Sequence, residues 1–241
     1  MTSYNFKKNI QPIWCPGCGL FMIHHILVQV LSELEYDNKN TVVVSGIGCS
    51  GRAAGYMNLD SVHTTHGRAI TVAEGIKLAN PKLNVIVVSG DGDLLAIGGN
   101  HLIHTANRNT DIKIICNFNE IYGMTGGQYS PTTPEGKKTL TTPDGSMGSP
   151  FSIQGYITSN SKFFFARTAS FDLKHMKSIF KEALLWKGFS FIKALSPCIT
   201  NYGRRQGYKN AAAMNKEMKA YFSYQENTEK LARQELGFIH S

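Results

Sequence analysis

The sequence contains no run of eighteen or more apolar residues, and its first ten residues, MTSYNFKKNI, lack the apolar core of a secretory signal. These absences argue against a transmembrane helix and predict a soluble cytoplasmic protein with no membrane partner. The cytoplasm keeps thiols reduced, and five cysteines are an odd number, so a disulfide framework is not expected. We therefore expect the cysteines to bind metal or to lie buried as free thiols.

Acidic residues are scarce in the last third of the chain. Between residues 160 and 220 there are twelve Lys or Arg residues and three Asp or Glu residues, in a chain of net charge +8. Such an excess is typical of a surface for an anionic partner or of a solvated basic face. The segment has neither interleaved aromatic residues nor a known nucleic-acid motif, so no nucleic-acid partner is expected.

Helical and strand patterns alternate from residue 19 to residue 196. Apolar spacing predicts helices at 19–35, 67–80, 94–109 and 172–187, and apolar runs predict strands at 41–46, 84–93, 112–119, 162–168 and 189–196. Nearly all-apolar strands between helices predict an α/β fold, a parallel sheet flanked by helices. Residues 121–150 are rich in Gly, Pro, Ser and Thr, as in a long functional loop. We predict one domain at 1–200 and a polar, partly helical tail at 201–241.

The segment SGDGD, residues 89–93, lies where a predicted strand ends and a helix begins. Gly90 and Gly92 allow a tight turn close to a ligand, and Asp91 offers a hard oxygen to a divalent cation. The next strand ends in an amide, Asn119 or Asn117, and neighbouring parallel strands end at one edge of a sheet. Such oxygens suit Mg²⁺, although Asp91 could instead cap the helix. The segment does not match G-x-G-x-x-G, which argues against a nicotinamide dinucleotide site.

Four cysteines lie in glycine-flanked or strand-end positions: Cys15 and Cys18 in WCPGCG, Cys49 in GIGCSG and Cys198 in LSPCIT. Four thiolates suit tetrahedral zinc or a 4Fe–4S cluster, and spacing alone leaves both open beside buried thiols. The flanking glycines favour the cluster, because they let backbone N–H groups face sulfur. Cys116 lies within an apolar strand and is predicted to be a buried core thiol.

Six blocks, in order from about residue 12 to residue 205, carry a resemblance to a known family: WCPGCG, VVVSGIGCSGR, HTTHGRA, GIKLANP, GDGDLLAIGGNHLIHTANRN and IYGMTGGQYSPTTP. Together they resemble the β subunit of 2-oxoacid:ferredoxin oxidoreductases, most closely the 2-oxoglutarate type. GDG followed by an Asn-bearing strand end is similar to the thiamine diphosphate and Mg²⁺ motif of thiamine-dependent enzymes. The resemblance implies a thiamine diphosphate-binding fold of the diphosphate-binding type.

The resemblance also implies roles for individual residues. It implies that Mg²⁺ is held by Asp91, Asn119 and the carbonyl of Ile121, and that one 4Fe–4S cluster is held by Cys15, Cys18, Cys49 and Cys198. The residues implied to bind thiamine diphosphate are Ile47, Gly48, Cys49, Ser50, His66, Gly90, Gly92, Asp93, Asn119, Tyr122 and Gly123. His63 and His66 are candidate catalytic residues that would donate hydrogen bonds to the substrate carboxylate or the thiazolium side. The alternative is that both histidines are ordinary polar residues at a helix start.

The implied reaction converts a 2-oxoacid, coenzyme A and oxidised ferredoxin into an acyl-CoA, CO₂ and reduced ferredoxin. The resemblance implies an α subunit that supplies much of the substrate site, and an assembly of two αβ heterodimers. Ferredoxins are typically acidic, which would suit the basic stretch at 160–220.

The expected substrate is 2-oxoglutarate, with pyruvate or a branched-chain 2-oxoacid as the alternative. Two competing functions are a non-redox thiamine-dependent decarboxylase or carboligase with structural zinc, and a basic nucleic-acid-binding protein with a zinc site. The nucleic-acid-binding alternative leaves unexplained both the GDG segment and the segment NFN, residues 117–119, at the end of the next strand.

Overall fold

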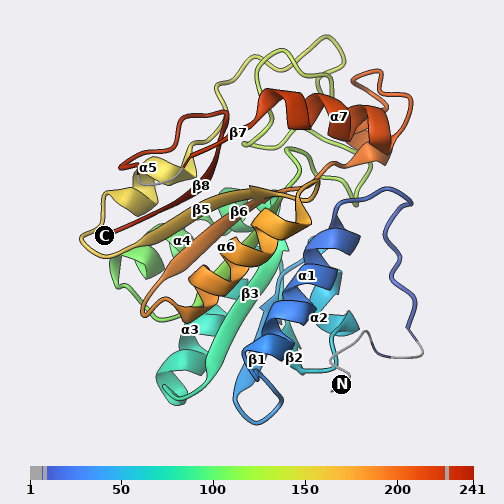
Figure 1. Cartoon of the computed structure of the whole chain (residues 1–241). Coiled ribbons are helices and arrows are strands. Elements are labelled where there is room, and N and C mark those ends of the chain that lie inside the picture. Colours follow the sequence, from blue (N-terminus) through green and yellow to red (C-terminus); the bar gives the residue numbers. More distant parts are fainter. Residues whose placement is uncertain (1–6, 8–9, 226–227) are drawn as a thin grey trace.

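Apolar strand runs and helices assemble into three layers in the computed structural model, which describes residues 7, 10–225 and 228–241 (Figure 1). The sheet has the strand order β2-β1-β3-β4-β6-β5-β8-β7. Its strands are β1 (Thr41–Ser45), β2 (Asp60–His63), β3 (Asn84–Gly90), β4 (Lys113–Phe118), β5 (Phe164–Ala169), β6 (Ser190–Leu195), β7 (Ser223–Tyr224) and β8 (Glu235–His240). The strands from β2 to β5 pair in parallel, and β8 pairs antiparallel with β5. The predicted parallel sheet is therefore confirmed.

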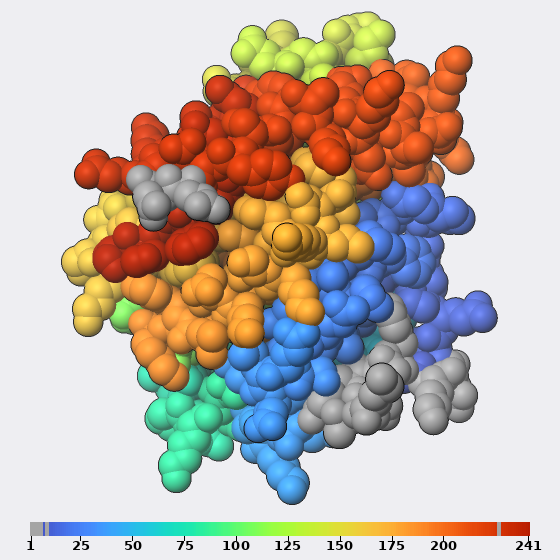
Figure 2. Space-filling model, viewed as in Figure 1, coloured from blue at the N-terminus to red at the C-terminus, as the bar shows by residue number. Residues whose placement is uncertain are grey.

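Helices cover both faces of this sheet. The helices are α1 (Leu20–Glu33), α2 (Ala53–Tyr56), α3 (Ala69–Ala79), α4 (Gly99–Asn107), α5 (Ile153–Thr158), α6 (Leu173–Leu185) and α7 (Ala211–Tyr221). Three shorter helical segments are η1 (Ser50–Arg52), η2 (Gly92–Ile97) and η3 (Ile199–Gly203), of which the last two have π-helical hydrogen bonding. In the space-filling view, α1 and α6 lie side by side on one face (Figure 2).

The core follows the two-residue alternation of the strands. On β1, Val43 belongs to the apolar cluster beneath α1, α2 and α6, and Val44 belongs to the cluster beneath α3, α4 and α5. On β3, Ile86 and Val87 divide in the same way. Both faces of each central strand are thus buried, which explains why the strands read as continuous apolar runs.

The C-terminal segment, predicted as a partly helical tail, also contributes a strand to the sheet. Besides α7, it forms β8, whose Leu236 and Ile239 are buried and whose backbone pairs with β5. Neither β8 nor β2 was predicted from the sequence. No helix among the described residues is both long enough and apolar enough to cross a lipid bilayer.

Candidate functional site

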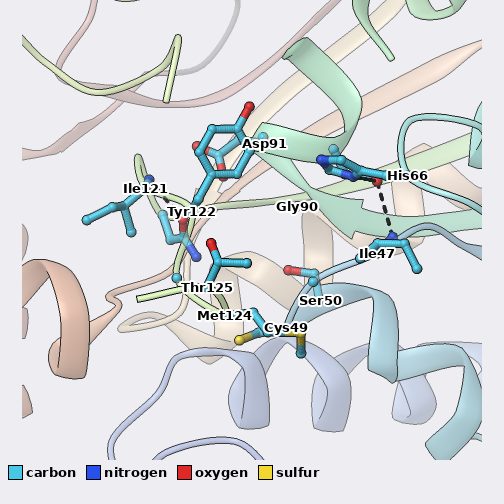
Figure 3. Close-up of a pocket in the computed structure, with 15 residues that line it drawn as sticks. Ile47, Cys49, Ser50, His66, Gly90, Asp91, Ile121, Tyr122, Met124 and Thr125 are labelled. Atoms are coloured by element: carbon cyan, nitrogen blue, oxygen red, sulfur yellow. Dashed lines mark hydrogen bonds and ion pairs between the residues drawn. The ribbon is translucent and has the colours of Figure 1, made fainter. Parts of the chain in front are cut away.

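The carboxyl ends of β1, β3 and β4 open onto one cavity of about 150 Å³. These strands are parallel neighbours, so the loops that follow them meet at one edge of the sheet. The cavity is lined by Ile47, Gly48, Cys49, Ser50, His66, Gly90, Asp91, Gly92, Asp93, Asn119, Ile121, Tyr122, Gly123, Met124 and Thr125. In the close-up, Tyr122 lies across the cavity from His66 and Ile47, and Cys49 lies toward α1 (Figure 3). Every residue expected at thiamine diphosphate lines this cavity.

Asp91 is the buried acid of the site, with 1% of its surface exposed. Its carboxylate accepts a hydrogen bond from the backbone N–H of Glu120 at 2.9 Å and another from the hydroxyl of Thr132. Burial raises the pKa of Asp91, because water no longer stabilises its charge. A bound divalent cation would restore that stabilisation, so a buried carboxylate at a cavity fits the magnesium site expected here.

Asn119 and Asn117 were the two candidates for the amide ligand of the metal, and their side chains lie in different places. Asn119 lines the cavity, and its Oδ1 accepts a hydrogen bond from the N–H of Ile121 at 3.1 Å. Asn117 is buried outside the lining, and its amide donates to the Ser50 hydroxyl at 2.8 Å. Asn119 and Ile121 therefore share the cavity with Asp91. Glu120, between them, has the left-handed backbone angle φ of 65°, which helps to turn the chain around the cavity.

Asp93 joins three loops through its buried carboxylate. Oδ1 accepts from the N–H groups of Ile47 at 3.1 Å and Gly67 at 2.8 Å, and Oδ2 accepts from the hydroxyl of Ser89 at 2.8 Å. Gly46 is required nearby, because a Cβ there would lie 2.0 Å from Oδ2. Although Asp93 lines the cavity, its carboxylate faces these donors, and a negative charge would repel a diphosphate. In this arrangement the carboxylate ties the three loops together.

The two candidate histidines occupy different places. His66 lines the cavity, its Nδ1 lies 2.5 Å from Oδ1 of Asp93, and 40% of its side-chain surface is exposed. Its ring centroid is 6.4 Å from that of Tyr122. His63 is exposed at the end of β2, where its Nδ1 lies 3.0 Å from the Ser45 hydroxyl, and it does not line the cavity. His66 is therefore part of the site, and His63 lies outside the cavity lining.

Close packing explains one of the expected diphosphate residues, Gly92, and a second, Gly123, lies next to a cysteine. A Cβ on Gly92 would lie 2.5 Å from the Tyr122 ring, so only glycine lets this ring close over the turn after β3. A Cβ on Gly123 would lie 3.4 Å from Sγ of Cys198. The loop after β4 therefore contacts both the turn after β3 and the cysteine that follows β6.

Hydrogen bonds bring the distant cysteine segments together. The indole N–H of Trp14, next to Cys15, donates to the carbonyl of Cys49 at 2.7 Å. Gly19, next to Cys18, donates to the carbonyl of Pro197, next to Cys198, at 3.5 Å. A Cβ on Gly19 would lie 2.5 Å from Oγ of Ser196, so a side chain there would separate the two segments. Three parts of the chain thus converge on one end of the cavity.

The thiols of these segments interact electrostatically. Burial, reinforced by the charges of Cys198, Cys49 and Cys15, raises the pKa of Cys18 to about 12, and burial with Cys198 and Cys15 raises that of Cys49 to about 11. As free thiols both would stay protonated near neutral pH, and iron or zinc would ionise them. In the described part of the chain, no group of three or more His, Cys, Asp or Glu residues could hold a metal ion as it stands. Cys116, as expected, is buried in β4.

Sequence reasoning missed the contribution of the long loop at 121–150. Thr132 bonds Asp91, and the hydroxyl of Thr133 donates to the carbonyl of Glu120 at 2.6 Å. Both threonines are buried. The only signal in the sequence was the segment SPTTP, within a loop that was expected in general terms to be functional.

Comparison with known proteins shows which families have a similar sequence. Residues 46–194 match the family model of the thiamine pyrophosphate enzyme, C-terminal TPP binding domain. The chain is 44% identical over 216 residues to 2-oxoglutarate synthase subunit KorB of Methanothermobacter thermautotrophicus, covering 90% of this chain and 76% of that protein. It is 42% identical over 235 residues to the protein of the same name from Methanocaldococcus jannaschii, covering 97% and 87%.

Two further relatives extend the comparison. The 2-oxoacid:ferredoxin oxidoreductase subunit beta of Saccharolobus solfataricus is 46% identical over 189 residues, covering 78% of this chain and 62% of that protein. The solved structure of the 2-oxoglutarate:ferredoxin oxidoreductase from Magnetococcus marinus, with 2-oxoglutarate, coenzyme A and succinyl-CoA bound, superposes with a TM-score of 0.85. That chain is 28% identical, and the match covers 97% of this chain and 82% of that one.

Proposed function

This chain belongs to the family of 2-oxoacid:ferredoxin oxidoreductase β subunits, and we propose that it acts with an α subunit to convert 2-oxoglutarate and coenzyme A into succinyl-CoA and CO₂. The choice of 2-oxoglutarate over pyruvate or a branched 2-oxoacid rests on the names of the KorB relatives and of the solved neighbour. The electrons of the reaction would go to ferredoxin.

One observation carries the proposal. The cavity that would hold thiamine diphosphate and the group of converging cysteines share a wall, because Cys49 lines the cavity and Cys198 lies beside Gly123. A decarboxylase without redox chemistry would have no use for an electron carrier at this point. Such a juxtaposition favours an enzyme that removes electrons from the substrate and carries them away.

The cavity residues would divide the binding of thiamine diphosphate and Mg²⁺ among them. Asp91, Asn119 and the carbonyl of Ile121 are the proposed metal ligands, because their oxygens are hard donors at one cavity. When bound, thiamine diphosphate would supply a carbanion for addition to the 2-oxo group and a ring to accept the electrons of decarboxylation. The turns containing Gly90, Gly92 and Gly123 provide room for the diphosphate close to the backbone.

His66 is the proposed catalytic residue of this chain. Its Nδ1 is engaged by Asp93, so the other ring nitrogen is the one available for a hydrogen bond to the substrate. Asp93 fixes the ring orientation and stabilises a positive charge on the ring when a proton arrives. His63 stays a weaker proposal, because it lies outside the cavity lining.

Cys15, Cys18, Cys49 and Cys198 are proposed to hold one 4Fe–4S cluster. The converging segments and the electrostatic coupling of their thiols support this assignment. A structural zinc on the same cysteines is the alternative. Anaerobic purification distinguishes the two, since an iron- and sulfide-containing brown protein supports the cluster and a colourless zinc protein supports the alternative.

We propose that the protein is cytoplasmic, that two αβ heterodimers assemble, and that acidic ferredoxin docks on the exposed basic residues at 160–220. Arg204 is exposed and suits docking, whereas Arg205 donates to the carbonyl of Gly126 at 2.9 Å and holds the long loop. Neutralising Arg204 with Lys209 should therefore raise the KM for ferredoxin at low salt and leave viologen reduction unchanged. An unchanged KM would argue against docking there.

The test of the function is anaerobic co-expression with the α subunit, followed by coenzyme A-dependent viologen reduction. We expect reduction with 2-oxoglutarate to exceed that with pyruvate or branched 2-oxoacids. An Asp91→Asn variant should lose the activity, and Asp144→Asn, an exposed change in the loop at 121–150, should keep it. Absence of reduction with all these substrates would contradict the proposed function.

A further inference from the structure

A second cavity, of about 390 Å³, lies beside the first along the same edge of the sheet. One wall comes from the ends of β4, β5 and β6, and the opposite wall comes from α7, which crosses this end of the molecule (Figure 1). The two cavities share Asn119. A volume of this size is in the range of sites for small organic ligands.

Two cations from neighbouring strands enter this second cavity. Arg167 on β5 and Lys193 on β6 are partners in the parallel register, so they occupy adjacent positions in the sheet. Arg167 is 6% exposed, and burial lowers the pKa of Lys193 to about 8. Two like charges side by side on buried strands destabilise a protein unless an anion compensates them.

The direct contacts of these cations do not pair them with a carboxylate, and the acids that attract them act from farther away: Glu120 and Asp91 on Lys193, and Glu235 on Arg167. In the part of the chain that the structure describes, neither lies within ion-pair distance of a carboxylate. Arg167 donates through Nη1 to backbone carbonyls, including that of Glu235 at 2.8 Å, and among described residues its buried Nε has no hydrogen-bond partner. Lys193 places its Nζ 3.6 Å from the centre of the Phe118 ring.

The remaining charges of the cavity do not balance the two cations. Glu120 is the buried acid of the lining, and it accepts a hydrogen bond from the hydroxyl of Tyr202 at 3.2 Å. The other charged lining residues cancel in sign: Lys137, Arg233, Glu135 and Glu217. One positive charge therefore remains in excess. On the α7 side, Met214, Met218 and Phe222 give the lining an apolar part beside Glu217.

We propose that this second cavity binds a small organic anion, whose carboxylate or phosphate group lies between Lys193 and Arg167 and whose carbon skeleton packs against α7. An oxyanion would compensate the excess charge and give Arg167 an acceptor, and the methionines would adapt to an apolar body. The site differs from the thiamine cavity and does not depend on the reaction proposed for that cavity. Through Glu120, whose N–H bonds Asp91, its ligand would lie next to the metal-binding loop.

Isothermal titration calorimetry of the full chain tests the proposal. The chain is first saturated with thiamine diphosphate and Mg²⁺ in low-salt buffer, so that a phosphate probe cannot report the first cavity. Inorganic phosphate and glutarate are then titrated separately into the wild type, Lys193→Met and Lys181→Met. Lys181 is an exposed residue of α6 outside the cavity and provides the matched control.

We expect saturable binding of at least one probe to the wild type. Lys193→Met should weaken this binding about tenfold or more, because a hydrogen bond to a charged group is lost. Lys181→Met should leave the affinity unchanged. Preference for glutarate would identify a carboxylate ligand, and preference for phosphate would identify a phosphate ester. Without ligand, the melting temperature of Lys193→Met reports whether the variant folds, because the change also removes a cation that attracts the buried Glu120.

Two results would overturn the proposal: no binding of either probe, or equal affinity in the wild type and Lys193→Met. The titration is repeated on the complex with the α subunit. Binding by the chain that disappears in the complex would assign the cavity to the partner subunit instead.

Discussion

Asp93 and His66 form a hydrogen-bonded pair at the mouth of the first cavity, with 2.5 Å between Oδ1 of Asp93 and Nδ1 of His66. The carboxylate is almost completely buried, whereas the imidazole is partly exposed. Because the same oxygen also bonds the backbone of Ile47 and Gly67, the pair aligns the ring relative to the loop after β1. The geometry suits a histidine that must keep one tautomer and one orientation during a reaction.

Asp93→Asn should lower kcat for 2-oxoglutarate oxidation by at least about tenfold, because the amide cannot stabilise a positive charge on His66. The amide can still accept from the three Oδ1 donors while its NH₂ group faces Ser89, so thiamine diphosphate binding and the melting temperature should change little. Steady-state kinetics and calorimetry measure the two effects. Loss of both binding and stability would show that Asp93 only holds the loops together.

Gly92→Ala should weaken thiamine diphosphate binding by about tenfold or more, because the added methyl group displaces the Tyr122 ring at 2.5 Å. Gly75→Ala, in the middle of α3, provides the control, since nothing lies within 4 Å of the new methyl group. That variant should be stabilised by about 0.5–1 kcal/mol and should bind the cofactor normally. Equal cofactor affinity in the two variants would contradict the packing argument.

Glu74 on α3 anchors α4 through Arg108, whose Nε and Nη2 contact the two carboxylate oxygens at 2.8 and 2.5 Å. These hydrogen bonds lower the pKa of Glu74 to about 2, from an ordinary value of 4.5. The stabilisation is therefore complete above pH 4.5 and is lost as the pH falls toward 2. Since Arg108 is half exposed, Glu74→Gln should cost only about 1–2 kcal/mol of unfolding free energy at neutral pH.

Urea unfolding at several pH values measures this effect. The difference in unfolding free energy between the wild type and Glu74→Gln should shrink as the pH falls from 4.5 toward 2. Glu182→Gln, at an exposed position of α6, is the control and should be neutral throughout. A difference that does not depend on pH would show that packing, and not the charge of Glu74, provides the stabilisation.

Cys198→Ser should remove the visible absorbance and the bound iron of the anaerobically purified protein, because one thiolate ligand of the cluster is lost. Cys116→Ala removes a thiol that lies within β4, away from the converging segments, and should retain both signals. The pair of variants separates a ligand from a core cysteine. Normal iron content in Cys198→Ser would contradict the assignment of Cys198.

The central strands and the cavity could be predicted from the sequence, because local patterns encode them. The strands β3 and β4 are long apolar runs, and the glycines and acids that follow them stand at the strand ends that a parallel sheet brings together. Strands without an apolar run were missed. Each residue of β2 is exposed or only half-buried, and β8 depends on pairing with β5, some seventy residues earlier in the chain.

The roles of single side chains were harder to predict, since they depend on contacts between distant segments. Asp93 was expected near the diphosphate, and its bonds to Ile47, His66 and Gly67 could not be read from GDGD alone. Lys193 and Arg167 looked like part of a basic surface, and they became cavity residues only when β5 and β6 paired. Sequence patterns show which chemical groups are present, and the topology decides which of them meet.

The central claim is that this chain passes electrons from 2-oxoglutarate at the first cavity to a cluster on its own cysteines. The most direct test is the visible absorbance of the anaerobic αβ complex after addition of 2-oxoglutarate and coenzyme A without ferredoxin. We predict bleaching of the cluster absorbance, restored by oxidised ferredoxin and absent in Asp91→Asn. Release of CO₂ from 2-oxoglutarate with no change in the cluster absorbance would contradict the claim.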